Sequence, residues 1–396
     1  MTLPADVLVV GGGPAGLRTA AQLAGQGLRV RVLEEHARIG EPVHCTGIVG
    51  SEAFRLPNVP RTAQLGELQA ARFHSPAGLT LPYVGPSGEA CVIDRGVLDR
   101  ALGDQAVRAG AEVVTGARVV SLALEPRGVA VDVQTPSGPR VERASVCVLA
   151  CGASYRFQRR LGWGLPALFM VGAQAEARVR SAEALDVFCA PDVVPPGFGW
   201  LVPFERGGEL RAKVGVMTSA RPRAALKRLV ECLLVRGQLV DPPGPIITRL
   251  LPLGPLSRTF GDRVLAVGDA AGLVKPTTGG GIYYSLLSAG WAATAVSEAF
   301  DRSDFSAASL GAYEEMWRSE LGAELRMGMR FRRFAARLTG RDLDDLIDLA
   351  LRDGVMSVVR AHARFDWHGT LLRALVRHPG IAQILLRRVT ASAFRL

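Results

Sequence analysis

Residues 6–34 read DVLVVGGGPAGLRTAAQLAGQGLRVRVLE, and this stretch decides the fold. A short apolar run over 6–10 predicts a strand that ends in three glycines, and residues 15–26 predict a helix. The segment LRVRVL at 28–33 predicts a second strand, which closes with Glu34. A strand, a helix and a strand in this order are typical of a parallel sheet covered by helices, so the sequence predicts an α/β fold.

The glycines of this turn have the spacing of a dinucleotide-binding site. Gly11 permits the tight turn, Gly13 lets the backbone approach a pyrophosphate, and Gly16 lets helix and strand pack closely. The N-terminus of the helix favours an anion. Glu34 stands 18 residues after Gly16, where a carboxylate can accept hydrogen bonds from ribose hydroxyls. The predicted nucleotide-binding residues of this stretch are Gly11, Gly13, Pro14, Ala15, Gly16 and Glu34.

The composition is that of a globular protein with an excess of arginine. Of the 396 residues, 48% are hydrophobic and 21% are charged, and the net charge is +10. Only Lys213, Lys227 and Lys275 are lysines, so arginine supplies nearly all the positive charge. This excess fits a biased genome composition, an anionic lipid surface or a phosphate-bearing substrate. Nucleic acid is not expected as a partner, because basic and aromatic residues do not interleave and no zinc spacing is found.

The cysteines and the first residues favour a reducing compartment. None of the six cysteines forms a CxxC pair, and the opening MTLPADVLVV lacks the basic and apolar regions of a signal peptide. We therefore expect a cytoplasmic protein, with peripheral contact at the inner face of the membrane as an option. The uncharged stretch 276–297 predicts a buried helix rather than a membrane span. No metal site is expected.

The order of patterns predicts a split domain. A helix is expected within 92–109, short strands follow up to residue 135, and ASVCVLACG at 144–152 predicts a strand buried on both faces. Alternating runs between 169 and 218 predict an antiparallel sheet. We expect a Rossmann-like nucleotide domain from residues 1–70, 91–165 and 255–308, an inserted antiparallel β-sheet substrate domain from 71–90 and 166–254, and a C-terminal helical region from 309–396.

The segment RVLAVGDAAG at 263–272 identifies the nucleotide, which the glycine turn alone does not. It resembles the second fingerprint of the aromatic-hydroxylase-like superfamily of FAD-dependent flavoproteins. The resemblance implies FAD as cofactor, with Gly268 in the motif and Asp269 on the ribityl chain of the flavin. The segment DRGVLDRAL at 94–102 resembles the helix-start motif of that superfamily and implies that Arg95 contacts the nucleotide portion. Val119 stands where the backbone of these proteins contacts the adenine.

Three further motifs resemble those of geranylgeranyl reductases. PVHCTG at 42–47 resembles their PxxCxG, FGWLVP at 198–203 resembles their YxWxFP, and PTTGGGI at 276–282 resembles their PxxGGGI. The resemblance covers roughly residues 3–330 in the same order. Two residues depart from it. Phe198 replaces a tyrosine and removes its hydroxyl, and Val202 replaces a phenylalanine.

The resemblance implies further site residues. Cys45 is the expected catalytic residue, because the corresponding loop borders the flavin ring. His44 could act as an acid or a base, although a histidine in a polar loop is more often at the surface. The expected cofactor contacts are, besides those of the glycine turn, Cys45, Thr46, Gly47, Arg95, Val119, Gly268, Asp269, Gly280, Gly281 and Ile282. The expected substrate contacts are Phe198, Trp200 and Pro203.

The implied activity is saturation of C=C bonds in a geranylgeranyl or related prenyl chain by hydride transfer from reduced FAD. The implied partners are a prenyl-chain lipid or prenyl diphosphate as substrate and NADPH or ferredoxin as electron donor. An isolated alkene has no carbonyl to polarise, so positioning in a dry channel must contribute much of the catalysis. The alternatives are an FAD-dependent monooxygenase of the same superfamily and, outside enzymes, a prenyl-binding carrier.

The amphipathic, arginine-rich tail offers a membrane contact. Its apolar residues are Phe331, Phe334, Leu338, Leu371, Leu372, Ile384 and Leu385.

Overall fold

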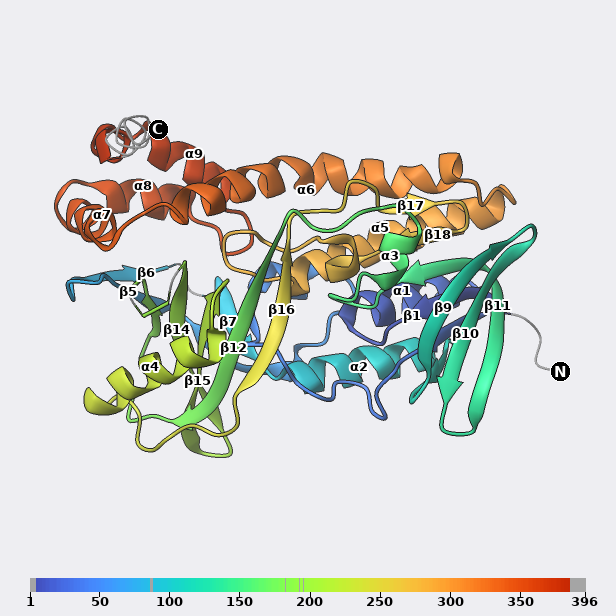
Figure 1. The fold of residues 1–396 in the computed structure, drawn as a ribbon, viewed down its shortest axis with the longest axis horizontal. Helices are drawn as coiled ribbons and strands as arrows, with labels where there is room; N and C mark the ends of the chain where they lie inside the picture. Colours follow the sequence, from blue (N-terminus) through green and yellow to red (C-terminus); the bar gives the residue numbers. More distant parts are fainter. Residues whose placement is uncertain (1–4, 86–87, 182, 192, 195, 385–396) are drawn as a thin grey trace.

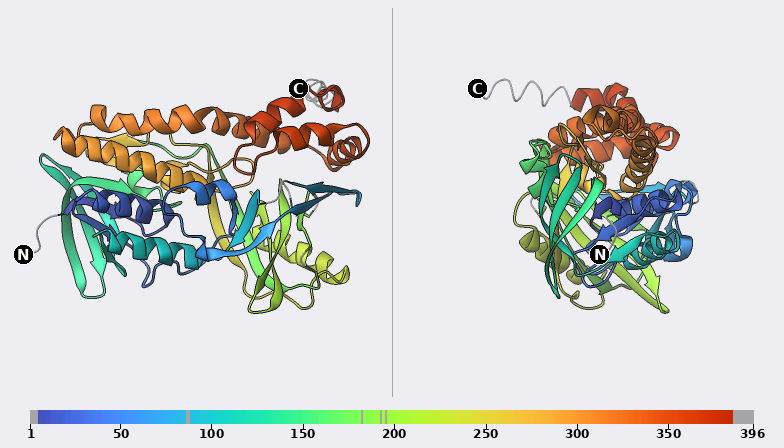
Figure 2. Two further views of the ribbon diagram at one scale, coloured as in Figure 1. Left: turned by 180° about the vertical axis from the view of Figure 1, so that it is seen from behind. Right: turned by 90° about the vertical axis from the view of Figure 1, so that its right-hand side faces the viewer.

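The protein consists of two large sheets side by side, with a layer of C-terminal helices across both (Figure 1). The computed structural model describes residues 5–384 except 86–87, 182, 192 and 195. Figure 2 shows that the layer of helices keeps to one side of the sheets when the molecule is turned. The predicted α/β class, with a Rossmann-like domain, a second sheet and a helical C-terminal region, is confirmed.

The first sheet carries the glycine turn at its centre. Its core strands β1, β2, β11 and β18 are parallel, and the apolar residues of the runs 7–10, 146–149 and 264–266 are buried. The path of the sheet is β17-β18-β11-β1-β2-β8, and β9 and β10 extend it antiparallel from β11. The strands are β1 (Ala5–Val10), β2 (Val30–Leu33), β8 (Glu112–Val114), β9 (Arg118–Glu125), β10 (Gly128–Thr135), β11 (Gly138–Leu149), β17 (Phe260–Gly261) and β18 (Val264–Ala266).

Helices α1 (Pro14–Gly25), α2 (Arg95–Arg108) and α5 (Ile282–Asp301) pack beside this sheet, and α1 lies against both α2 and α5. The short α3 (Arg156–Arg160) follows β11. The helix expected within 92–109 begins later than predicted, at Arg95. Asp94 caps it by accepting a hydrogen bond from the Val97 amide at 3.0 Å. The preceding apolar residues belong instead to β7 (Ala90–Ile93).

The second sheet has the order β16-β12-β15-β14-β13-β5-β6. Its neighbours are antiparallel except β13 and β5, which are parallel, because β5 comes from a distant part of the chain rather than from a hairpin. Helix α4 (Pro222–Val235) covers one face. The strands are β5 (Ala70–His74), β6 (Thr80–Val84), β12 (Leu168–Arg178), β13 (Leu185–Phe188), β14 (Gly197–Arg206), β15 (Glu209–Thr218) and β16 (Ile247–Leu253).

A small third sheet links the two halves. Strands β3 (Ile48–Gly50) and β4 (Gln64–Leu68) both pair antiparallel with β7. Two single turns of 3-10 helix, η1 (Ser51–Arg55) and η2 (Arg61–Ala63), lie between β3 and β4, and a third, η3 (Gly268–Ala271), follows β18. The loop before β3 is therefore held at the junction of both large sheets, which is where the candidate site lies.

The C-terminal layer begins with the long helix α6 (Ala307–Ala335), which runs beside α5 and reaches from one sheet to the other (Figures 1 and 2). It continues with α7 (Gly340–Arg352), α8 (Val355–His362) and α9 (Gly369–Arg377). Helix α5 fills most of the uncharged stretch and is largely buried, as expected. Among the described residues, no helix is long and apolar enough to cross a bilayer.

The loop between α8 and α9 ties this layer to the nucleotide domain. Asp366 forms a 2.6 Å ion pair with Lys275, and the two side chains are only 2% and 5% exposed. Tyr284 of α5 donates a hydrogen bond to the Asp366 carbonyl at 2.9 Å. His368 lies 2.6 Å from the Thr277 hydroxyl. Burial, with Lys275 nearby, lowers the pKa of His368 to about 3, so its ring is neutral at pH 7.

Replacing Asp366 by alanine is expected to destabilise the protein by about 3–5 kcal/mol, because the Lys275 ammonium would remain buried without its carboxylate. Asp348 provides the matched control, since its pair with Arg352 has the same 2.6 Å distance but side chains that are 37% and 77% exposed. The D348A variant should lose less than about 1 kcal/mol. Urea unfolding of both variants measures the difference, and equal losses would contradict the structural role of the buried pair.

Candidate functional site

A cavity of about 490 Å³ lies between the first and second sheets. Its wall contains most of the residues that the sequence singled out, from motifs that are up to 271 positions apart. From the nucleotide domain these are Gly11, Gly13, Pro14, Ala15, Glu34, Arg95, Val119, Asp269, Gly280, Gly281 and Ile282. The loop before β3 contributes Cys45, Thr46 and Gly47, and β14 contributes Phe198 and Trp200.

The glycine turn is shaped by close backbone contacts. A Cβ on Gly11, whose φ is +111°, would lie 2.4 Å from the Ala150 carbonyl oxygen. A Cβ on Gly16 would lie 2.1 Å from the Gly11 carbonyl oxygen, so Gly16 seats α1 on the strand and does not line the cavity. A Cβ on Gly13 would meet no atom within 4 Å. The backbone at Gly13 therefore opens onto the cavity, as an approaching pyrophosphate requires.

Two helix N-termini open onto the same cavity. Helix α1 follows Gly13 and helix α5 follows Gly281, and neither N-cap residue carries a side chain that could satisfy the first amides. Neither helix has an acidic residue in its first turn. The unpaired amides and the positive ends of both helix dipoles thus favour negative charge in this cavity.

Glu34 lies at the end of β2, next to the glycine turn. Its carboxylate accepts a hydrogen bond from the Gly12 amide at 2.6 Å and contacts His36 through both the amide, at 2.9 Å, and the ring Nδ1, at 2.5 Å. These contacts hold the carboxylate in place beside the glycine turn. Gly12 and His36 were not predicted, although both flank predicted residues.

Charged residues from other elements also line the cavity, among them Arg95, Asp99 and Asp269. Arg95 donates to Asp99 one turn later at 2.7 Å. Burial opposes the charged guanidinium, but the Asp99 carboxylate outweighs it and the pKa of Arg95 is raised. Burial raises the pKa of Asp269, whose backbone carbonyl accepts a hydrogen bond from Tyr155 at 2.5 Å. The carbonyl of Val119 accepts a hydrogen bond from Arg156 at 3.3 Å.

The loop of the PVHCTG motif bridges the two sheets. Thr46 donates to the Gln174 side chain of β12 at 2.8 Å, and the sulfur of Cys45 accepts the Gly47 amide at 3.2 Å. His44 is half-buried: it lines the cavity, and its Nδ1 is buried without a partner among the described residues. Burial, and then nearby Arg249, lowers the pKa of His44.

Strand β14 supplies the apolar wall through alternate residues. Phe198 and Trp200 point into the cavity, with ring centroids 5.8 Å apart. The indole lies over Gly215, where a Cβ would come within 2.3 Å of the ring. The indole Nε1 is buried without a hydrogen-bond partner among the described residues. The absence of a side chain at Gly215 thus makes room for the indole of Trp200, whose N–H edge packs on the backbone of β15.

Besides Gly16, two predicted residues do not line the cavity. Pro203 is an odd number of residues from Trp200, so it lies on the other face of β14, opposite Ala212 and above α4. Gly268 lies behind the wall, where its amide donates to the Ser288 hydroxyl at 3.0 Å. Both residues are buried and support the residues that face the cavity.

Several wall residues were not predicted. Arg249 and Leu251 come from β16, Lys275 precedes the PTTGGG loop, and Phe365 comes from the C-terminal layer. No motif in the sequence assigned Lys275 to the site, and it stood out only as one of three lysines. Arg249 has no local motif, and Phe365 reaches the cavity only through the packing of the last helices.

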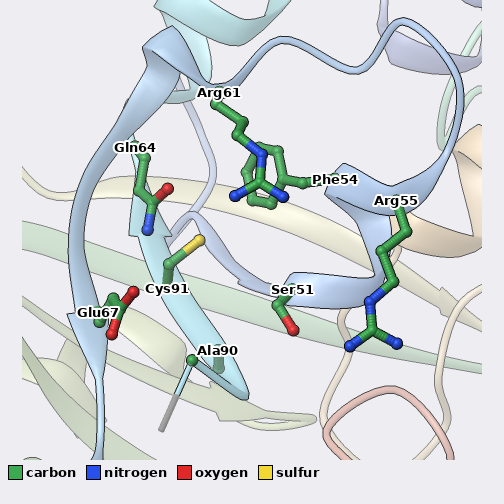
Figure 3. Close-up of a pocket in the computed structure, with 9 residues that line it drawn as sticks. Ser51, Phe54, Arg55, Arg61, Gln64, Glu67, Ala90 and Cys91 are labelled. Atoms are coloured by element: carbon green, nitrogen blue, oxygen red, sulfur yellow. The ribbon is translucent and has the colours of Figure 1, made fainter.

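A second cavity of about 230 Å³ shares no residue with the first (Figure 3). It lies at η1, η2 and the three-stranded sheet, and Arg61 lies over the Phe54 ring at 5.8 Å. Its remaining labelled residues are Ser51, Arg55, Gln64, Glu67, Ala90 and Cys91. Within the described residues, no group of histidine, cysteine and acidic side chains could hold a metal ion.

Comparisons with known proteins agree with this geometry. A family model described as NAD(P)-binding Rossmann-like domain matches residues 9–63, and one described as lycopene cyclase protein matches residues 248–347. The chain is 30% identical to digeranylgeranylglycerophospholipid reductase 2 of Methanopyrus kandleri, over 90% of this chain and 92% of that protein. It is 29% identical to the protein of the same name from Methanothermobacter thermautotrophicus, over 96% and 98% of the two chains.

The structure of a geranylgeranyl bacteriochlorophyll reductase-like protein from Thermoplasma acidophilum matches with a TM-score of 0.85 at 23% identity, over 97% of this chain and 99% of that one. Together with the reductases that the chain resembles in sequence, the fold and the cavity define an oxidoreductase built on a Rossmann-like domain. The similarity of sequence over nearly the whole chain then names the family: the chain belongs to the geranylgeranyl reductase family, as its motifs predicted.

Replacing Gly11 by alanine is expected to abolish retention of the flavin, because the new Cβ would collide with the Ala150 carbonyl and displace the turn. Gly27 is the matched control. Its φ is +89°, yet a Cβ there would meet no atom within 4 Å, so G27A carries only a backbone cost of about 1–2 kcal/mol. Visible absorbance per mole of purified protein measures the bound flavin. A G11A protein with the flavin content of the parent would contradict the assignment.

Proposed function

We propose that this protein is an FAD-dependent reductase that saturates C=C bonds of a geranylgeranyl or related prenyl chain. The observation that carries the proposal is one cavity whose wall joins a dinucleotide turn to an apolar aromatic surface, with Cys45 in that wall. Relatives named digeranylgeranylglycerophospholipid reductases support the substrate class.

The residues present fit FAD. Gly13 leaves space that a Cβ would fill, Glu34 is held near the turn, and the N-termini of α1 and α5 favour the anionic parts of the cofactor. Arg95 and Asp269 would face the nucleotide and ribityl portions. Reduced FAD, when bound, supplies the hydride for the reaction.

The apolar wall fits a prenyl chain. Phe198, Trp200, Ile247 and Leu251 offer carbon surface without charge, and Phe365 adds a ring from the C-terminal layer. Such a wall excludes water and holds the alkene near the cofactor, which is how a substrate without a polar handle can be oriented. Arg249, an exposed residue of the same cavity, could meet a phosphate headgroup at its opening.

The proton for the second alkene carbon requires a donor in the wall. Phe198 has no hydroxyl, so a donor role for the tyrosine of the YxWxFP motif cannot apply here. Cys45 is our candidate, because its sulfur lines the cavity in the loop that joins both sheets. His44 lines the same cavity and is the second candidate, with its unpaired Nδ1.

The electron donor is proposed to be NADPH or ferredoxin.

Membrane contact through the C-terminal region is also a proposal, and burial reduces the number of side chains that could make it. Leu372 and Ile384 are buried, Phe331 is exposed, and Leu385 lies outside the described residues. Flotation with anionic vesicles at low salt tests this contact, and protein left at the bottom of the gradient would exclude it.

The activity is tested with the purified holoenzyme, reduced chemically and incubated with geranylgeranyl diphosphate or a digeranylgeranylglycerophospholipid. We expect products heavier by whole multiples of two hydrogens in mass spectrometry. A product that gains oxygen under air with NADPH would favour the monooxygenase instead. A colourless protein that binds prenyl chains but takes up no FAD would favour the carrier.

Replacing Cys45 by alanine or serine is expected to lower the rate of prenyl reduction by about 10²–10⁴-fold while FAD stays bound, because the proton donor is lost. Cys232 of α4 is exposed and remote from the cavity, so C232A serves as the control with unchanged rate. Single-turnover oxidation of the reduced enzyme by the substrate gives the rate. A C45A enzyme as fast as the parent would exclude this role for Cys45.

A further inference from the structure

Lys213 of β15 is a buried lysine without a carboxylate partner among the described residues. Its side chain is almost fully enclosed, with the residue 2% exposed. The ammonium donates one hydrogen bond to the Ile93 carbonyl at 3.3 Å and lies 5.5 Å from the centroid of the Phe204 ring. Lys275, by contrast, is buried with its carboxylate 2.6 Å away.

The nearest carboxylates are occupied by other cations. Glu176 is paired with Lys213 in strand register, but its carboxylate bonds Arg206 at 3.1 Å and lies 3.8 Å from Arg211. Asp94 also bonds Arg206, at 3.3 Å. Burial lowers the pKa of Lys213, and Cys45, Glu176 and Asp94 oppose that effect. A lone buried ammonium is costly, so packing alone does not explain this residue.

Lys213 lies on the cavity face of the second sheet. In the register of β14 and β15 it stands opposite Val202, two residues from Gly215, over which Trp200 lies. Adjacent to it on this face, Gln174 of β12 holds Thr46 through the 2.8 Å hydrogen bond. The ammonium therefore lies directly beneath the loop of the PVHCTG motif.

Gly47 lies next to both the sulfur of Cys45 and the ammonium of Lys213. The Gly47 amide donates to the Cys45 sulfur at 3.2 Å, and a Cβ on Gly47 would lie 3.0 Å from Nζ of Lys213. Gly47 has a φ of +76° and its Cβ position lies 2.5 Å from the Ile93 carbonyl oxygen, so only glycine allows this approach. Arg95 also lies near the sulfur, but it is paired with Asp99.

We propose that Lys213 is a positioning residue that stabilises negative charge on the Cys45 sulfur. The inference rests on the proposed function. When the thiol gives its proton to one alkene carbon and the other carbon receives hydride from the reduced cofactor, the S–H bond breaks and a thiolate remains. The Lys213 ammonium, which has no carboxylate to neutralise it, stabilises that thiolate until water returns the proton.

The test measures Cys45 directly and needs no prenyl substrate. The holoenzyme is treated with iodoacetamide near neutral pH, and the rate of Cys45 alkylation is followed by peptide mass spectrometry. Because the thiolate is the reactive form, K213M should slow this rate by about tenfold, and K213R should retain most of it. Lys227, an exposed lysine of α4, gives the control K227M with an unchanged rate.

Retained flavin absorbance and an unchanged melting temperature show that K213M has folded. If K213M does not fold, K213Q is measured in its place. If bound flavin shields Cys45 from the reagent, the ultraviolet absorbance of the thiolate during a pH titration, taken as the difference from C45S, gives the same comparison. Equal thiolate formation in the parent and the Lys213 variant would overturn the proposal. Failure of prenyl reduction would overturn the proposed function alone.

Discussion

The geometry of the site depends on one close approach of backbone to backbone. Gly11 lies so near the Ala150 carbonyl, and Gly16 so near the Gly11 carbonyl, that no side chain fits at either position. This contact sets α1 against the ends of two central strands and points its first amides into the cavity. Asp269, at the end of a third strand, and α5 then complete the same wall. A shift of this turn would therefore move the first amides of α1 away from the residues of the other elements that line the same wall.

The second sheet depends on the period of two residues along its strands. One face packs on α4 with small and branched side chains, and the other carries Gln174, Trp200, Lys213 and Gly215. Because opposite residues of paired strands share a face, the register brings these four residues from three strands under one loop. A slip of one residue would turn Trp200 and Lys213 into the α4 core and destroy the cavity wall.

Short motifs made the nucleotide half predictable, because each records a turn whose geometry is fixed by its immediate neighbours. Asp269, Arg95 and the glycines could be placed for this reason. Pro203 shows the limit of such motifs, since membership in FGWLVP does not say which face of a strand a residue takes, whereas the alternation does. Asp366 and Lys213 could not be placed at all. Their partners are Lys275, 91 residues away, and Ile93, 120 residues away, and only the packed fold brings them together.

The two buried lysines differ in whether a carboxylate neutralises their charge, and this difference separates a structural role from the role that we propose for Lys213. Lys275 and Asp366 neutralise each other, so their pair holds the C-terminal layer and leaves little field beyond it. Lys213 keeps its charge uncompensated, since Arg206 takes both nearby carboxylates. The side chain of Lys213 is enclosed by the protein, so solvent does not screen this charge. The packing of the second sheet against the loop of the PVHCTG motif is therefore the condition under which, as we propose, a single ammonium acts on Cys45.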